Sequence, residues 1–312
     1  MRQILTENHN GLLRYEIAPE VTAFSPLRDA VLPTRVVQAH QVHGDRVAVV
    51  TSAGTTREEL EGYDALVTDV PGVAIGARTA DCIPVLMYDP VHKAVAAVHS
   101  GWKGTVVKIA AKTLAVMASK YGTQPKDILA VIGPGIGPDS FQVGPEVAEA
   151  FLSAGFPETW SRPSLPIKHS TDGSEKTETV TCSHSSTTQP HTGEDAPFTQ
   201  HSSGLVHNFP LVITGSTESS PIDNHTIRLI TDRGPRIPGS MSGGLHIDLP
   251  QAVRLTLIRA GVHDVNVLIS GIDTYSHPGF FSARREGPSC GRTVNTIMLN
   301  PSPSPEPSKK LP

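Results

Sequence analysis

Short apolar runs separated by turn residues dominate the first half of the chain. Runs with the length and composition of β-strands lie at residues 47–51, 65–68, 73–77, 84–88, 94–99 and 128–133. The segment TVVKIAAKTLAVMASKYG, from Thr105 to Gly122, carries apolar residues at helical spacing, and PEVAEAFLSAG predicts a second helix from Pro145 to Gly155. Strands that alternate with helices in this way predict an α/β fold with helices packed on a sheet.

The pattern changes at about residue 160. From there to about residue 243 the chain is rich in Ser, Thr, Pro, His and Gly, and such a segment buries too little apolar area to offset the entropy of ordering. We therefore expect a long flexible insertion, in which short islands such as LVITG and TIRLIT could still be strands. We expect its histidines to be solvated rather than to bind metal, namely His169, His184, His191, His201 and His207.

The globular pattern resumes after the insertion. In HIDLPQAVRLTLIRAGV, Asp248 can cap a helix with one apolar face, and the strand-like VNVLIS follows. The tail, residues 300–312, is rich in Pro and Ser and is expected to be disordered. The sequence thus predicts a single domain over residues 1–312, interrupted by the low-complexity insertion at about 160–243 and ending in this tail.

Composition and charge narrow the class of protein. The 312 residues are 38% hydrophobic, which suits a globular core, and the formal net charge of -4 gives no basic footprint for nucleic acid or anionic lipid. The first residues lack the apolar core of a signal peptide, and no run is long enough to span a membrane. Three widely separated cysteines argue against a disulfide framework. We expect a cytoplasmic protein.

Three segments place a histidine or cysteine where it could carry chemistry. His99 ends the strand AVAAVH, Cys82 directly precedes the strand around PVLMY, and His43 follows His40 in the loop QAHQVHGDRV. Each has a plain alternative, such as a hydrogen-bonded core histidine or a small buried thiol. Their spacing matches no zinc finger. As a chemical set, however, two imidazoles and one thiolate suit zinc and leave a fourth position open.

Other motifs are more ambiguous. Trp102 is either a core anchor or a wall on which a planar base stacks. The loop in VIGPGIGPDSFQVGPEV lacks the lysine and spacing of a phosphate-binding P-loop, so its glycines are expected to shape a turn. In FFSARREGPSCGR, Arg284, Arg285 and Arg292 either form a solvated surface or clamp an anion such as phosphate.

Taken in order, these motifs resemble the laccase-domain, or YfiH-like, family of purine nucleoside enzymes. The resemblance rests on QVHGDRV, TADCIPVLMYDP, AAVHSGWKGT, IGPGIGPDSFQVGPEV, a DLP-type helix and FFSARREG, and it covers about residues 30–155 and 244–295. It implies an α/β catalytic domain of mixed β-sheets covered by helices. It also implies a zinc-dependent purine nucleoside phosphorylase, acting on adenosine, inosine and methylthioadenosine with phosphate, that deaminates adenosine as well. The implied zinc ligands are His43, Cys82 and His99.

Further roles follow from these motifs as expectations. We expect Asp81, beside a ligand, and Arg285, as a phosphate holder, to be catalytic. We expect Gln41, Trp102 and Lys103 to bind substrate.

Three positions depart from the family pattern. The family motif HAGWRG has alanine and arginine where this chain has Ser100 and Lys103, and lysine lacks the bidentate fork of arginine. Asp273 stands where family members often carry a cysteine before FFS.

Three other functions stay open at this point. A copper-dependent phenol oxidase is the older family label, but multicopper sites need more histidines than the matching segments supply. A cysteine hydrolase or amidase would use Cys82 as nucleophile and His99 as base, and would survive chelation but not alkylation. A metal-stabilised binding module would lose its fold, rather than turnover, on chelation.

Overall fold

The computed structural model describes residues 4–5, 11–157, 230–233 and 244–301. The chain divides into two units, Met1–Arg162 with His225–Pro312, and Pro163–Asn224, and every described residue belongs to the first. Most of the expected insertion, including the LVITG island and its five histidines, lies outside the described residues, as does the tail after residue 301. The expected insertion and disordered tail therefore stay predictions.

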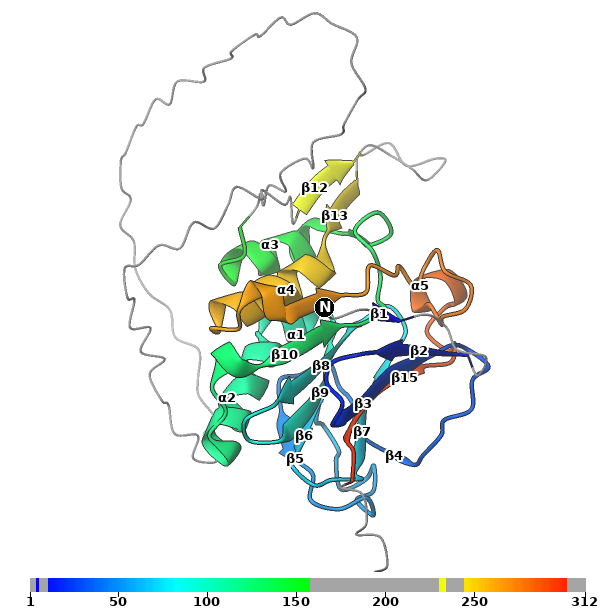
Figure 1. Cartoon of the computed structure of the whole chain (residues 1–312). Helices are drawn as coiled ribbons and strands as arrows, with labels where there is room; N and C mark the ends of the chain where they lie inside the picture. Colours follow the sequence, from blue (N-terminus) through cyan, green and yellow to red (C-terminus); the bar gives the residue numbers. More distant parts are fainter. Residues whose placement is uncertain (1–3, 6–10, 158–229, 234–243, 302–312) are drawn as a thin grey trace, which may run out of the picture. The chain divides into compact units, whose positions relative to one another are not determined.

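Two six-stranded sheets and one small sheet make up the fold (Figure 1). The first sheet has the order β1 (Ile4–Leu5), β2 (Leu12–Tyr15), β3 (Val21–Pro26), β15 (Thr293–Leu299), β7 (Ala74–Thr79) and β4 (Val36–Gln38). The second, central sheet has the order β14 (Val267–Ile269), β10 (Leu129–Ile132), β8 (Ile83–Asp89), β9 (Ala94–Ser100), β6 (Ala65–Thr68) and β5 (Val47–Val49). The small antiparallel sheet joins β11 (Gln142–Val143), β13 (Gly244–Ile247) and β12 (Ile230–Arg233).

Both large sheets combine parallel and antiparallel pairs, which confirms the prediction of mixed sheets. In the first sheet β4 runs parallel to β7 while β15 runs antiparallel to it. In the central sheet β10 is parallel to β14 but antiparallel to β8. The predicted strand segments of the first half all fall on strands of these two sheets.

The central sheet is buried on both faces, which explains why its strands are continuous apolar runs. Side chains alternate along β8, so that Val85 and Met87 join the core under the helices while Leu86 and Tyr88 join the core against the first sheet. Residues of β9 alternate in the same way. The described part of the fold therefore has three layers, with the central sheet between the helices and the other large sheet.

The helices are α1 (Trp102–Val106), α2 (Ile109–Tyr121), α3 (Pro145–Ser153), α4 (Leu249–Arg259) and the short α5 (Ala283–Glu286), with 3-10 turns at Pro125–Asp127 and Asp264–Asn266. Asp248 caps α4 as predicted, since its carboxylate accepts the backbone N–H of Gln251 at 3.1 Å. The helix expected from Thr105 to Gly122 is interrupted, because Lys108 adopts a left-handed conformation (φ 61°) between α1 and α2. Among the described residues, no helix has the length and apolarity needed to cross a bilayer.

Strand register brings the candidate ligands together. Pro84 of β8 pairs with His99 of β9, so Cys82, just before β8, lies near the end of β9 that carries His99. On the other side of β9, Ala65 of β6 pairs with Val98, and the His99 backbone N–H donates to the carbonyl of Asp64 at 2.8 Å. Residues that are far apart in sequence thus meet at one end of the neighbouring strands β8, β9 and β6.

Candidate metal centre and adjoining cavity

His43, Cys82 and His99 form a compact cluster of possible metal ligands. One ligand atom from each residue lies within 4.8 Å of the others, and the two imidazole rings are 4.8 Å apart between centroids, nearly perpendicular. His99 is buried, Cys82 is partly buried and His43 is exposed, so the cluster opens to one side. Among the described residues this is the one group of three His, Cys, Asp or Glu side chains that could hold a metal ion. The structure therefore brings together the three ligands that the family resemblance implied.

Asp64, which the sequence reasoning missed, fixes two of these ligands. Its carboxylate is buried and accepts the Nδ1–H of His99 at 2.8 Å, which leaves the Nε2 lone pair of His99 for a metal. The same carboxylate accepts the backbone N–H groups of Val42, His43 and Gly44. One buried side chain thereby sets the tautomer of His99 and holds the loop that carries His43.

The loop around His43 has little conformational freedom. His43 has a φ of 62°, a left-handed conformation that costs free energy for a residue other than glycine. The hydrogen bonds to Asp64 stabilise this turn, which places the imidazole beside Cys82. Opposite it, a Cβ atom on Gly101 would lie 3.0 Å from both the Cys82 Sγ and the His43 ring, so a larger residue there would push against both ligands.

The protonation states in the metal-free cluster favour metal binding. Burial raises the pKa of the Cys82 thiol, but the charge of His99 and hydrogen bonds from both histidines outweigh it and lower this pKa to about 6. Burial lowers the pKa of His99, but the Cys82 thiolate and Asp64 raise it to about 9. A cation at this position would replace the proton shared by the thiolate and the imidazole, so the residues present fit a soft divalent metal ion.

A cavity of about 530 Å³ adjoins the cluster. Its lining includes His43 and His99 of the cluster and three arginines, Arg57, Arg78 and Arg292. Its volume suits a small-molecule ligand. This cavity, rather than the cluster alone, is the candidate active site.

The residues expected to bind substrate lie differently with respect to this cavity. Gln41 lines it, but its amide group bonds the backbone of Arg78, donating to the carbonyl and accepting from the N–H, both at 2.8 Å. Trp102 is partly buried against the core under the helices, and the exposed Lys103 ammonium lies 5.6 Å from its ring centroid. Neither Trp102 nor Lys103 lines the cavity, so their roles in binding stay predictions.

Comparison with known proteins agrees with the fold and the cluster. The sequence matches the family described as multi-copper polyphenol oxidoreductase laccase over residues 25–178 and 222–300. A purine nucleoside phosphorylase of Bacteroides thetaiotaomicron is 33% identical over 270 residues, which are 85% of this chain and 72% of that protein. The chain belongs to the laccase-domain, or YfiH-like, family.

One further relative and one solved structure are similar over most of the chain. A protein named adenosine deaminase RL5, from an unknown prokaryotic organism, is 30% identical over 269 residues, or 84% of this chain and 74% of that protein. The crystal structure of the Bacillus licheniformis hypothetical protein YfiH superposes with a TM-score of 0.63 at 21% identity, covering 95% of this chain and 98% of that one. The second match shows the shared fold, which confirms the predicted architecture.

The side chain of Asp81, one of the two expected catalytic residues, is hydrogen-bonded to other parts of the fold. Asp81 is 9% exposed and has a left-handed φ of 85°. Its carboxylate accepts the Thr274 hydroxyl at 2.7 Å and the backbone N–H of Arg284 at 2.7 Å. The side chain thus joins the start of β8 to the loop after β14, and its role in proton transfer stays a prediction.

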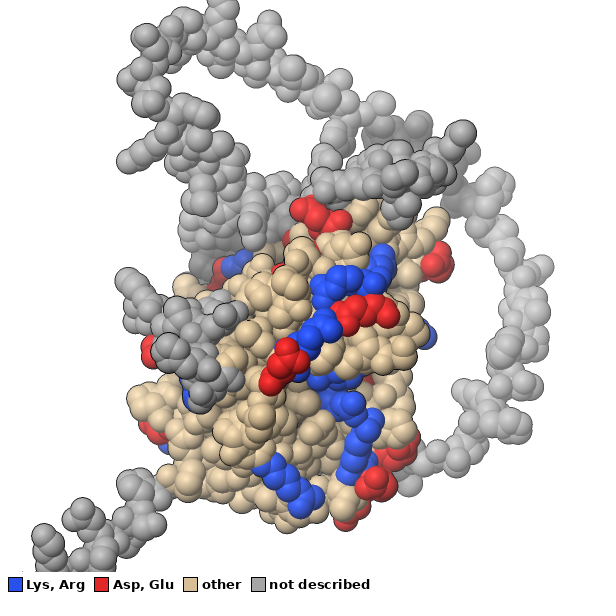
Figure 2. All heavy atoms as spheres, turned by 90° about the vertical axis from the view of Figure 1, so that its right-hand side faces the viewer, with Lys and Arg blue, Asp and Glu red and all other residues tan. Residues whose placement is uncertain are grey.

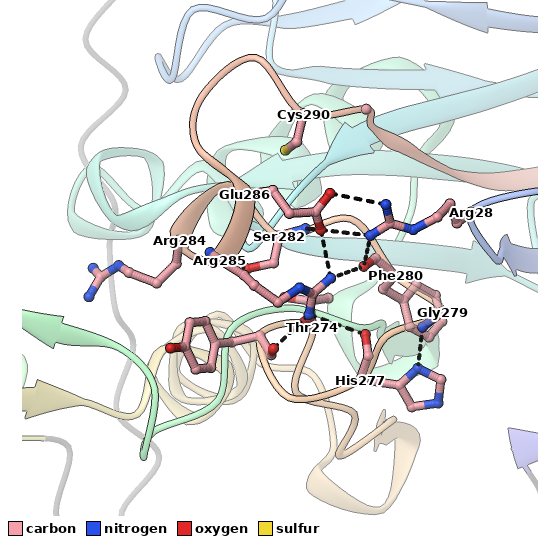
Figure 3. Close-up of polar contacts among 12 residues, drawn as sticks. Arg28, Thr274, His277, Gly279, Phe280, Ser282, Arg284, Arg285, Glu286 and Cys290 are labelled. Atoms are coloured by element: carbon pink, nitrogen blue, oxygen red, sulfur yellow. Dashed lines mark hydrogen bonds and ion pairs between the residues drawn. The ribbon is translucent and has the colours of Figure 1, made fainter. Parts of the chain in front are cut away.

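The side chain of Arg285, the other expected catalytic residue, likewise forms its hydrogen bonds within its own loop (Figure 3). Its guanidinium donates to the carbonyls of Thr274, Tyr275 and Phe280 at 2.6 to 2.7 Å and pairs with Glu286, which also binds Arg28. Arg285 does not line the 530 Å³ cavity. These contacts stabilise the loop that leads to Cys290 and β15, whereas the role of Arg285 as a phosphate holder stays a prediction.

Asp273 acts in the same loop. Its carboxylate accepts the backbone N–H groups of Gly137 and Tyr275 and the hydroxyl of Ser140. It thereby fastens the Gly/Pro-rich loop after β10, which supports the expectation that those glycines shape a rigid turn.

Proposed function

We propose that this protein is a zinc-dependent purine nucleoside phosphorylase that also deaminates adenosine. The observation that carries the proposal is the juxtaposition of a three-ligand cluster, His43, Cys82 and His99, with a cavity lined by three arginines. The names of the two relatives above, a purine nucleoside phosphorylase and an adenosine deaminase, support the same assignment. Adenosine, inosine and methylthioadenosine are the proposed nucleosides, and phosphate is the proposed co-substrate.

The ligand set favours zinc over copper in this proposal. Two imidazoles and a thiolate are typical of catalytic zinc sites that keep one position open. When bound there, zinc would supply Lewis acidity next to the cavity. The residues of the chain do the rest: Asp64 keeps His99 in the ligating tautomer, and Gly101 leaves room for the ligands to approach one another.

A second candidate is a cysteine hydrolase. The lowered pKa of Cys82 and the raised pKa of His99, each due to the other's charge against the effect of burial, are typical of a nucleophilic thiolate beside an imidazolium. The copper-dependent phenol oxidase has less support, since the described residues offer one three-ligand group rather than the several that a multicopper site needs.

The deciding experiment follows the products chromatographically. Zinc-loaded protein is incubated with adenosine, with and without phosphate, beside His43→Ala, Cys82→Ala, Asp81→Asn and Arg285→Gln variants. We expect adenine and ribose 1-phosphate only with phosphate, inosine in both conditions, and neither activity in the two ligand variants. Activity that survives chelation but not alkylation would overturn this proposal in favour of the cysteine hydrolase.

A further inference from the structure

Arg78 lies in an unusual setting for an arginine. It belongs to β7, is partly buried, and faces the 530 Å³ cavity beside His43 and His99. Within the described part of the chain, its guanidinium has no hydrogen bond or ion pair. A partly buried cation without a partner is costly, so this position is explained best by a ligand that supplies the missing charge.

The two other arginines of the cavity increase the positive charge around Arg78. Arg57 uses only its Nε, which donates to the carbonyl of Ala39 at 3.3 Å, and the rest of its guanidinium has no described partner. Arg292 donates to the carbonyls of Pro288, Cys290 and Gly291 and to the Cys290 Sγ, so it is held at the cavity wall and contributes positive charge there rather than free donors. Burial lowers the pKa of Arg78, and repulsion by Arg57 and Arg292 lowers it further.

No carboxylate lines this cavity, so nothing in its described walls neutralises the three arginines. Figure 2 shows basic side chains on the face that lies to the right in Figure 1, where a band of them runs down the surface with acidic side chains at its edges. The cavity differs from such a mixed surface, because its charged side chains are of one sign. Its wall is therefore complementary to an anion.

The sheet explains how the arginines converge. Val294 of β15 pairs with Arg78 of β7, and Thr293 pairs with Thr79. Arg292 directly precedes β15, at the end of the strand where Thr293 pairs with Thr79, and this brings it close to Arg78. The Gln41 amide group donates to the backbone carbonyl of Arg78 and accepts from its backbone N–H, so the backbone that carries the Arg78 side chain is held in place.

We propose that Arg78 and Arg57 form the phosphate subsite of this enzyme, with the positive charge of Arg292 beside them. This inference rests on the proposed phosphorylase function and places its co-substrate, phosphate, beside the arginines of the cavity. Planar guanidinium groups bind phosphate oxygens through paired, charge-assisted hydrogen bonds. Arg285, whose donors are used by the carbonyls of its own loop, supports the fold beside the subsite.

This placement suits the reaction. A phosphate oxygen forms a bond to C1′ of the ribose, the C1′–N bond to the base breaks, and its electron pair leaves with the base, which takes up a proton. No oxidant or reductant is needed. A phosphate held by Arg78 would lie in the same cavity as the His43 and His99 side chains, next to the nucleoside.

The test measures phosphate binding directly and does not depend on turnover. Inorganic phosphate is titrated calorimetrically into zinc-loaded wild type, Arg78→Gln, Arg78→Lys and Arg57→Gln. Loss of one charge-assisted contact should weaken phosphate binding about 10–100-fold in Arg78→Gln. Arg78→Lys should recover part of the affinity, since it keeps the charge but loses the fork. Arg35→Gln is the matched control, because Arg35 is exposed and does not line the cavity.

Kinetics separate this inference from the proposed function. Arg78→Gln should raise the KM for phosphate about 10–100-fold while the KM for nucleoside changes little. If wild type phosphorolyses nucleosides and both Arg78→Gln and Arg57→Gln bind phosphate as wild type does, the subsite is wrong although the function stands. If phosphate binds through Arg78 but no base is released, the subsite stands and the phosphorylase is wrong. A zinc-loaded wild type that binds no phosphate would overturn the subsite outright.

Discussion

Replacing Asp64 with asparagine should weaken metal binding although it removes none of the three metal ligands. The change keeps the size of the side chain and leaves His43, Cys82 and His99 in the chain, so any loss of affinity reports on how the ligands are held. Asp64 accepts four hydrogen bonds, one from the His99 imidazole and three from the loop of residues 42–44. Oδ1 accepts from His99 and His43, and Oδ2 accepts from Val42 and Gly44.

An asparagine at position 64 has one side-chain oxygen, so it can accept the hydrogen bonds of only one of these two pairs of donors. If its oxygen takes the place of Oδ1, the NH₂ group faces the N–H donors of Val42 and Gly44, and the loop that carries His43 loosens. If the amide turns over, the NH₂ group faces His99 Nδ1 and favours the tautomer whose Nε2 carries the proton, which cannot bind metal. Loss of such a supporting group costs about 10–100-fold in metal affinity, or about 1.4–2.8 kcal/mol.

Competition with a chromophoric chelator measures this affinity for Zn²⁺ in wild type and Asp64→Asn. Asp45→Asn is the control, because Asp45 lies in the same loop and its carboxylate forms a surface ion pair with Lys112. It removes the same charge at a similar place, and we expect a change of less than about twofold, as for an exposed ion pair. Equal zinc affinities for Asp64→Asn and wild type, with both proteins folded by circular dichroism, would refute the reasoning.

Three other predictions concern the remaining parts of the molecule. Arg285→Met should lower the free energy of unfolding in urea by roughly 2–3 kcal/mol, since three carbonyl acceptors lose their donor; an unchanged unfolding curve would contradict the contacts in Figure 3. In metal-free protein, alkylation of Cys82 should fall roughly tenfold between pH 7 and pH 5, because burial raises its pKa but the histidines lower it to about 6; a midpoint near pH 8.5 would argue against this pairing. Replacing residues 163–224 with a short Gly/Ser linker should leave kcat/KM within about threefold, as expected for an insertion outside the catalytic domain, whereas loss of zinc binding would show that the segment belongs to the site.

The local pattern of the sequence determined most of the elements of the fold. Apolar runs with strand composition predicted β5 to β10, and the Asp248 cap and its apolar face predicted α4. These predictions succeed because strand and helix periodicity is a property of neighbouring residues. The break at Lys108 was not predictable in this way, since a single left-handed residue interrupts an otherwise regular helical pattern.

The sequence also determined which residue types could bind a metal, and the family resemblance of its ordered motifs predicted His43, Cys82 and His99 as the ligands. Only the tertiary structure decided what surrounds them. Asp64 and Arg78 carry no local signal, because one precedes an ordinary strand and the other lies inside one. Their partners lie across strand pairs and loops, and such contacts depend on register, which is set by packing of the whole sheet rather than by neighbours in the chain. For the same reason Arg285, the arginine favoured from sequence, faces the carbonyls of its own loop, while three other arginines line the cavity.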